Sequence, residues 1–184
     1  AEWIFFHLHC KTVGYHNDMY PPSAQGQARE VPVQDQVDEY EVIGPDGYGY
    51  PIYALKQNHK ALYGSLISEQ DMAKAYDDGN PYVNRDPRFY RDIIYHGSMF
   101  KGKWINTATG ADAINAANST STGYFTRKYF DGYYTKGMSG NWNFDAPLIR
   151  LATIYLVYAE AVTRSKGATP EVYNLMNELR ARSF

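Results

Sequence analysis

The chain has 184 residues, a formal net charge of −2 and a single cysteine, which excludes a disulfide within the chain. Lys and Arg are not clustered along the sequence, so the charge pattern disfavours a nucleic-acid-binding protein. No apolar run reaches the roughly 20 residues that a membrane-spanning helix requires.

The first fifty residues predict one strand followed by loops. Residues 2–10 alternate between two apolar faces, as a buried strand does. His7 and His9 project from the same face, but no third ligand is suitably spaced, so we predict no metal site. Residues 11–31 and 44–51 contain turn-forming residues such as Gly, Pro and Asp, which predicts two exposed loops.

Capping patterns predict short helices in the first half of the chain. A short amphipathic helix is expected over residues 33–40, directly after a proline. Ser68 and Asp71 form a capping box at the start of a second helix. Asp86 and Pro87 provide the cap and the first-turn proline of a third. We interpret the charged side chains here as local structural pairs and not as catalytic groups: Asp86, Arg88 and Arg91.

Short strands and a polar loop are predicted next. Residues 93–95 and 99–105 predict two strands around a turn at residues 96–98. Residues 106–122 are small and polar, which predicts a surface loop, and residues 123–130 alternate as a strand does.

Residues 145–184 predict two helices packed as a hairpin. The first is expected to begin at Asp145, an N-cap residue, with Pro147 in its first turn. Apolar residues recur at three- and four-residue steps, and much of the opposite face is also apolar, so we expect this helix to be buried on most sides. Gly167 ends it and Thr169 caps the second helix. The pair has the size of a tetratricopeptide repeat.

Three blocks in this order resemble the SusD/RagB family. Residues 80–89 and 123–129 resemble two internal blocks of the family. Residues 146–152, 156–161 and 176–182 resemble its C-terminal signature. The resemblance implies a mainly α fold, with a tetratricopeptide-like helical hairpin, long ordered loops and a few short strands.

The resemblance also implies a domain organisation and a location. Residues 1–184 would form the C-terminal portion of a SusD-like domain, loop-rich over residues 1–144 and a helical hairpin over residues 145–184. Because one helix pair leaves an apolar face uncovered, we expect further helices N-terminal to Ala1. The resemblance implies surface exposure on a Bacteroidetes-type outer membrane, through an N-terminal lipid anchor that this chain lacks.

Glycan capture is the function that the resemblance implies. Such a protein would bind an oligo- or polysaccharide for import through a TonB-dependent, SusC-like transporter, as part of polysaccharide utilisation and without a cofactor. The RagB branch implies capture of peptides instead. A tetratricopeptide-like interaction scaffold is an alternative from another class.

A glycoside hydrolase is the enzymatic alternative, and the sequence disfavours it. Such an enzyme needs two carboxylates that face each other across a sugar. Asp145 is expected to be a cap, and Glu160 to pair with Arg180 or Arg182 of the following helix. No catalytic motif is present, so we predict a protein that is not an enzyme.

Loop aromatics are the expected ligand-binding residues. Aromatic side chains make up 16% of the chain and include 18 tyrosines, which join an apolar ring to a polar tip and stack on sugar faces. Residues 131–144 are broken by glycines just before the hairpin, so aromatics there can be exposed on a stiff base. Alternatively, Trp142 covers the outer face of the hairpin together with Phe144. The expected ligand-binding residues are Tyr133, Tyr134 and Trp142, then Trp104 and Tyr20.

Overall fold

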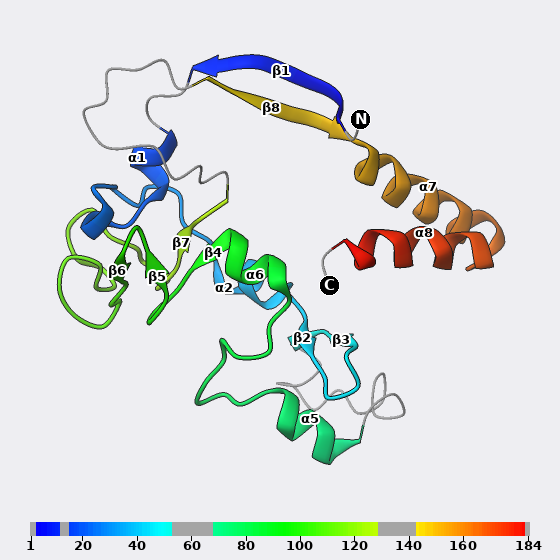
Figure 1. Ribbon diagram of the computed structural model, residues 1–184, viewed down its shortest axis with the longest axis horizontal. Helices are drawn as coiled ribbons and strands as arrows, with labels where there is room; N and C mark the ends of the chain where they lie inside the picture. Colours follow the sequence, from blue (N-terminus) through cyan, green and yellow to red (C-terminus); the bar gives the residue numbers. More distant parts are fainter. Residues whose placement is uncertain (1–2, 12–14, 53–67, 129–142, 183–184) are drawn as a thin grey trace. The chain divides into compact units, whose positions relative to one another are not determined.

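The structure is a computed structural model that describes residues 3–11, 15–52, 68–128 and 143–182 (Figure 1). The chain forms two compact units. Unit 1 comprises Ala1–Val13 and Ser139–Phe184, and unit 2 comprises Gly14–Met138.

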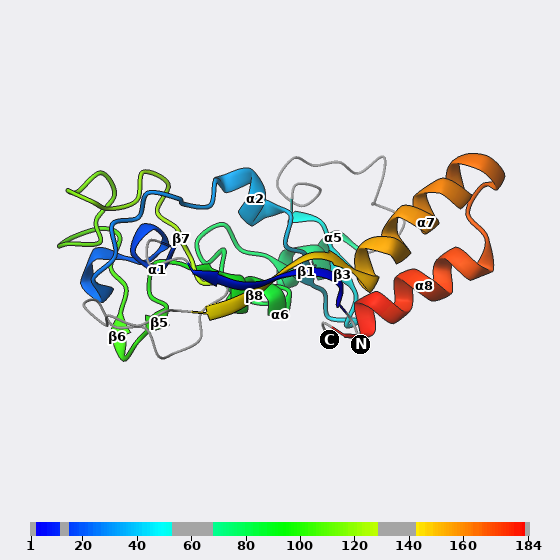
Figure 2. The same cartoon turned by 90° about the horizontal axis from the view of Figure 1, so that it is seen from above.

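Unit 1 is a two-stranded ribbon followed by two helices. Strand β1 (Trp3–Lys11) pairs antiparallel with β8 (Asn143–Arg150), and the ribbon leads into α7 (Leu151–Lys166) and α8 (Pro170–Ala181). Figures 1 and 2 both show α8 returning beside α7. The strand predicted for residues 2–10 and the helical hairpin are therefore confirmed. The strand is not buried as predicted, because Ile4 is 54% and Phe5 58% exposed.

The predicted start of the first long helix is wrong. Residues 143–150 are extended, and α7 begins only at Leu151, after Arg150 as N-cap with φ −113° and ψ 155°. Asp145 is thus a strand residue and not a cap. A short apolar run fits either a strand or a helix, and pairing with β1 decides the outcome here because Phe6 and Pro147 lie opposite each other in the ladder.

The boundary between the two helices is as predicted. Gly167 has φ 82° and its N–H donates to the Thr163 carbonyl at 2.9 Å. Thr169 then caps α8 by accepting a hydrogen bond from the Val172 N–H, and Pro170 occupies the first turn. Local capping chemistry therefore sets this turn.

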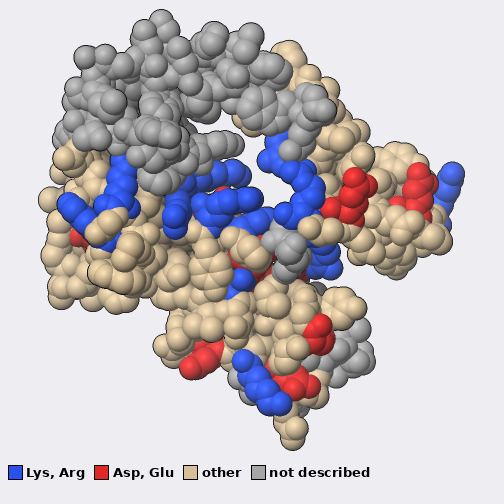
Figure 3. Space-filling model, in the orientation of Figure 1, with Lys and Arg blue, Asp and Glu red and all other residues tan. Residues whose placement is uncertain are grey.

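Helix α7 is less buried than predicted. Ala159 and, on α8, Val172 are buried, but most of the opposite face of α7 is solvent-exposed within the part of the chain that the structure describes. Figure 3 shows much of this helical pair in tan, the colour of residues other than Lys, Arg, Asp and Glu, with charged side chains at several places. The exposed apolar residues of α7 are Leu151, Ile154, Leu156, Val157 and Tyr158.

Glu160 is an exposed residue in an ion pair within its own helix. Its carboxylate lies 2.6 Å from the Arg164 guanidinium one turn later, and its side chain is 61% exposed. The part-buried pair with Arg180 or Arg182 that we predicted is therefore wrong, because Glu160 faces solvent and not the helix interface.

Unit 2 contains short elements joined by ordered loops. Its strands pair antiparallel as β2–β3, β4–β7 and β5–β6. In the described ranges of this unit the helices are α1 (Tyr15–Met19), η1 (Pro22–Ala24), α2 (Gln34–Asp38), α5 (Glu69–Ala75) and α6 (Pro87–Asp92). The strands are β2 (Val42–Ile43), β3 (Gly49–Tyr50), β4 (Ile93–Ile94), β5 (Met99–Phe100), β6 (Lys103–Trp104) and β7 (Phe125–Thr126).

Both cap-based helix predictions in unit 2 are confirmed. The Ser68 hydroxyl accepts from the Asp71 N–H at 3.1 Å and donates to the Asp71 carboxylate at 2.7 Å. Asp86 accepts from the Arg88 N–H at 2.8 Å at the start of α6. Helix α2 also lies within the predicted residues 33–40.

The strand predictions for unit 2 are partly wrong. Strand β4 pairs with β7 and not with β5 across the predicted turn at residues 96–98. Strand β7 covers only two residues of the predicted 123–130 segment among those described. The expected loop at 44–51 includes β3, and the expected loop at 11–31 includes α1 and η1.

Among the residues that the structure describes, three small buried clusters form the core of unit 2. One joins α1 to strands β4, β5 and β7, a second joins α2 to α6, and a third joins β2 to α5. No helix in the described ranges is long and apolar enough to cross a membrane.

Candidate functional site

The β5–β6 hairpin presents one exposed tryptophan to solvent. Phe100 and Lys103 form its last pair, so Lys101 and Gly102 are a two-residue turn with φ 48° and 73°. Two positive φ angles in such a turn characterise type I′, whose twist matches that of the strands. The turn therefore fixes which side chains share a face of the hairpin.

Alternation along the hairpin separates a buried face from an exposed face. Phe100 and Ile105 are buried in the core, whereas Trp104 is 69% exposed and its direct partner Met99 is 49% exposed. Cross-strand partners project from the same face of a ladder. Trp104 and Met99 thus form a small apolar surface, which we call the Trp104 surface, backed by the core.

Several hydrogen bonds hold the base of the Trp104 surface. The Ile105 N–H donates to the Ser98 carbonyl at 2.9 Å, and the Ser98 hydroxyl bonds with the backbone of Tyr95 at 2.7 and 3.0 Å. The Lys103 ammonium donates to the Ser23 carbonyl at 2.7 Å. These contacts tie the hairpin to neighbouring segments on its core side.

The loop after the hairpin is exposed, as predicted, and is ordered by its own polar contacts. The Asn106 amide oxygen accepts from the N–H groups of Ala108 and Thr109 at 2.9 and 3.1 Å. The Thr107 N–H donates to His96 Nδ1 at 3.1 Å. The segment that directly follows Trp104 in the chain is therefore held in place by hydrogen bonds of its own.

The other predicted ligand-binding residues fall into two groups. Tyr20 is only 2% exposed and packs edge-to-face on Phe100 with ring centroids 5.0 Å apart, while the Lys101 ammonium lies 4.9 Å from its ring centroid. A ring enclosed in this way cannot stack on a ligand, so the prediction for Tyr20 is wrong. The remaining three lie outside the described residues: Tyr133, Tyr134 and Trp142.

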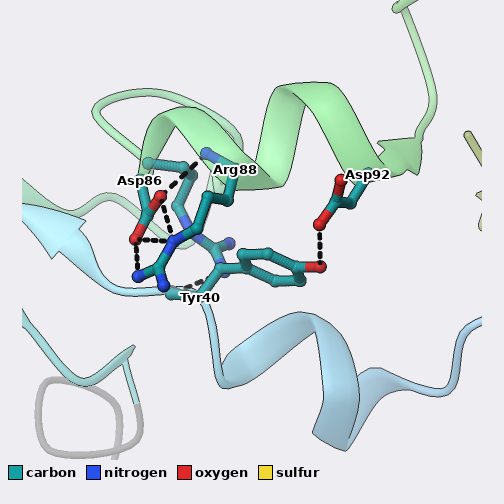
Figure 4. Close-up of polar contacts among 5 residues, drawn as sticks. Tyr40, Asp86, Arg88 and Asp92 are labelled. Atoms are coloured by element: carbon teal, nitrogen blue, oxygen red, sulfur yellow. Dashed lines mark hydrogen bonds and ion pairs between the residues drawn. The ribbon is translucent and has the colours of Figure 1, made fainter. Parts of the chain in front are cut away.

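A second polar group surrounds helix α6 (Figure 4). Tyr40 donates from its hydroxyl to the Asp92 carboxylate at 3.2 Å. Burial raises the pKa of Tyr40, and the Asp92 charge raises it further. Asp86 is fully buried and forms an ion pair with Arg88. The interpretation of Asp86 and Arg88 as a local structural pair is confirmed, whereas Arg91, which was grouped with them, approaches a carboxylate only at 3.9 Å, from its Nε to Asp92.

Arg85 is a buried structural cation beside this group. Its guanidinium donates to the carbonyls of Val37, Tyr40 and Pro81 and lies 4.7 Å from the centroid of the Phe89 ring. Burial lowers its pKa. These bonds tie α2 to α6, so Arg85 has a role in packing.

The structure also bears on possible metal sites. Within the described ranges, no group of three or more His, Cys, Asp or Glu side chains could hold a metal ion. The side chains of His7 and His9 are not among those described.

Sequence reasoning missed Met99 as the partner of Trp104. The signal that could have found it is the pair Lys101–Gly102 between two apolar-containing segments, which is compatible with a two-residue hairpin turn. The predicted turn at residues 96–98 is present, with the Ser98 N–H donating to the Tyr95 carbonyl at 3.0 Å. The single strand predicted for residues 99–105 is wrong, because the turn at Lys101–Gly102 divides it into β5 and β6.

Comparisons with known proteins give consistent matches. The model of the SusD family matches residues 2–184. A solved structure described as a SusD-like carbohydrate-binding protein from Bacteroides fragilis has a TM-score of 0.66 and 20% sequence identity, and the match covers 99% of this chain and 34% of that one. A SusD-like protein from the same organism has a TM-score of 0.61 and 24% identity, covering 99% of this chain and 36% of that one. No curated protein matches the sequence.

Both matched structures have a low sequence identity to this chain and are much longer than it. At such identities the two structures show a shared fold. The chain spans about a third of the length of each of them.

Proposed function

Because the chain belongs to the SusD family, we propose that the complete protein captures glycans at the cell surface for import. Its family makes it a binding protein and not an enzyme. In this proposal a lipid anchor holds it on the outer face of the outer membrane. A tetratricopeptide-like helical surface docks on a TonB-dependent, SusC-like transporter, and residues 1–184 form the C-terminal portion of the binding domain.

The Trp104 surface is the observation that carries the proposal. An indole that is 69% exposed has no role in the core of unit 2. Its base is nevertheless fixed by a tight turn and by buried residues on the opposite face. The flat apolar face of a sugar ring stacks on such a side chain, while nearby polar groups bind hydroxyls. Tyr133, Tyr134 and Trp142 remain proposed members of the same type of surface.

A binding screen of the complete protein tests the proposal. Affinity electrophoresis against neutral polysaccharides, followed by calorimetry, should find at least one glycan that binds without turnover. Trp104→Ala should remove a stacking contribution of about 1 kcal/mol, which weakens binding roughly fivefold. Tyr173→Ala is a matched control, because Tyr173 is an exposed aromatic of α8 in the other unit.

The other outcomes of the screen distinguish the alternatives. Binding of peptides but not glycans would select RagB-like peptide capture. Release of oligosaccharides would indicate a glycoside hydrolase, and the absence of any small ligand would favour an interaction scaffold. Equal effects of the Trp104 and Tyr173 variants on glycan affinity would contradict the assigned surface.

A further inference from the structure

A cluster of cations lies along the short helix α6 and at its C-terminal end. Arg88 and Arg91 lie three residues apart on this helix, which makes them neighbours on its surface. The backbone N–H groups of Arg127 and Lys128 donate to the Asp92 carbonyl at 2.8 and 3.2 Å, which brings both residues to the same end. Figure 3 shows Lys and Arg side chains gathered in the region of α6. We call these four residues the α6 cationic cluster.

The carboxylates of this region are already engaged. Asp86 is buried against Arg88, and Asp92 accepts the hydrogen bond from Tyr40. The Glu41 carboxylate also acts electrostatically on Arg88, so the region combines four cations with three carboxylates in a chain whose formal net charge is −2. It is a local excess of positive charge on a weakly acidic protein.

Arg91 is the member with the most unused binding capacity. Its side chain is 75% exposed, and its closest approach to a carboxylate is 3.9 Å, from Nε to Asp92. That distance is too long for a hydrogen bond. Within the described part of the chain its guanidinium makes no hydrogen bond, so its planar set of donors is available to a ligand.

Compensation of the helix dipole does not account for the whole cluster. A cation near a helix C-terminus is stabilised by the carbonyls there. Arg127 already fills this role, since its guanidinium donates to the Tyr90 carbonyl at 3.2 Å. The exposed guanidinium of Arg91 is additional.

We propose that the α6 cationic cluster binds the carboxylate of a uronic-acid unit in an acidic glycan, with Arg91 as the main contact. The inference rests on the proposed glycan capture. A guanidinium binds a carboxylate through two parallel hydrogen bonds, and the neighbouring cations add attraction. Asp86 and Asp92 disfavour a dense polyanion such as nucleic acid, whereas an isolated carboxylate on a sugar needs only the exposed guanidinium of Arg91 as its partner.

The experiment uses the complete protein, calorimetry and defined probes. The acidic probes are trigalacturonate and trimannuronate, and the neutral probe is the methyl ester of trigalacturonate. Arg91→Gln should weaken binding of at least one acidic probe about tenfold, and Arg91→Glu should abolish it, with no effect on the methyl ester. Lys74→Gln is the control, because Lys74 is an exposed cation of α5 in the same unit. Thermal melts confirm that each variant is folded.

The outcomes separate this inference from the proposed function. If neither acidic probe binds while a neutral glycan does, the cluster is not a uronate site but glycan capture stands. The inference is also overturned if Lys74→Gln weakens binding as much as Arg91→Gln, which would mean a general charge effect. Equal binding of a triglutamate peptide would overturn the assignment to sugars. Tighter binding of an acidic probe in low salt, which is reduced in Arg91→Gln and lost in Arg91→Glu but kept in Lys74→Gln, supports it.

Discussion

The turn of the β5–β6 hairpin allows a quantitative test of the structure. Gly102 has φ 73°, a conformation that costs an L-residue about 1–2 kcal/mol. A Cβ added there would meet no atom within 4 Å, so the cost of Gly102→Ala is backbone strain alone. The lower unfolded-state entropy of alanine offsets about 0.4–1 kcal/mol. We therefore expect a net loss near 1 kcal/mol, or a Tm lower by about 2–4 °C.

Two further variants make the test specific. Gly102→Asn should cost less than Gly102→Ala, because asparagine tolerates the left-handed region. Gly110→Ala is a matched control, since Gly110 has φ 84° and equal open space but lies outside the hairpin. Both alanine variants should lower Tm to a similar degree. Only Gly102→Ala should reduce hydrogen-exchange protection of the Ile105 N–H, which bonds to the Ser98 carbonyl.

The reasoning fails if the Gly102→Ala protein melts like the wild type. It also fails if the alanine variant is more stable than the asparagine variant, because the turn would then not have the observed backbone angles. Unchanged protection of the Ile105 amide would show that the turn does not control the hairpin.

Three other predictions follow from particular side chains. Tyr50 donates to the Asp46 carboxylate at 2.5 Å; this bond is the main cause that lowers the pKa of Asp46 and raises that of Tyr50 to about 12. The bond should therefore stabilise the fold at neutral pH. Its contribution to stability should fade as pH falls through the lowered Asp46 pKa or rises towards 12. The Tm difference between wild type and Tyr50→Phe should therefore be largest between these two pH limits. A Tm difference that does not depend on pH would contradict this. Glu160→Gln removes an exposed ion pair with Arg164 and should lower the free energy of unfolding in urea by about 0–1 kcal/mol. A decrease of more than about 3 kcal/mol would indicate that Glu160 has a buried partner after all. Alanine variants of Tyr133, Tyr134 and Trp142, which lie outside the described residues, should each weaken glycan binding several-fold with unchanged Tm. Unchanged affinity in these variants would move the proposed site to the loops around Tyr48.

Helix ends could be predicted from the sequence because they depend on local chemistry. Ser68, Asp86 and Thr169 each bond a backbone N–H two or three residues later. The residues needed for such a bond are adjacent in the chain. The same holds for Gly167, whose positive φ ends α7.

Strand pairing could not be predicted in the same way because it depends on distant partners. Residues 143–150 carry a plausible cap and an apolar run, yet they pair with residues 3–11. Likewise, Ile93 and Ile94 pair with β7, some thirty residues later, and not with the next strand along the chain. The local pattern was compatible with both arrangements, and only the tertiary contacts decide between them.

The predicted ligand-binding residues differ in solvent exposure, and the sequence did not reveal this difference. Tyr20 and Trp104 are both aromatic and both belong to loop-rich regions, but one is enclosed by Phe100 and the other is open to solvent. The difference arises from the face of the hairpin on which Phe100 lies. A tyrosine next to that face becomes part of the core, whereas the tryptophan on the opposite face stays available.

The rigidity of the Trp104 surface has its origin in loop contacts more than in the sheet. Strands of two residues are too short to be stable alone. The hairpin is held instead by the Ser98 hydroxyl on Tyr95 and by the Lys103 ammonium on Ser23. An exposed aromatic binds a sugar well only if little freedom is lost on binding. Ser98 and Lys103 are therefore part of the proposed binding surface, because their hydrogen bonds fix the position from which Trp104 projects.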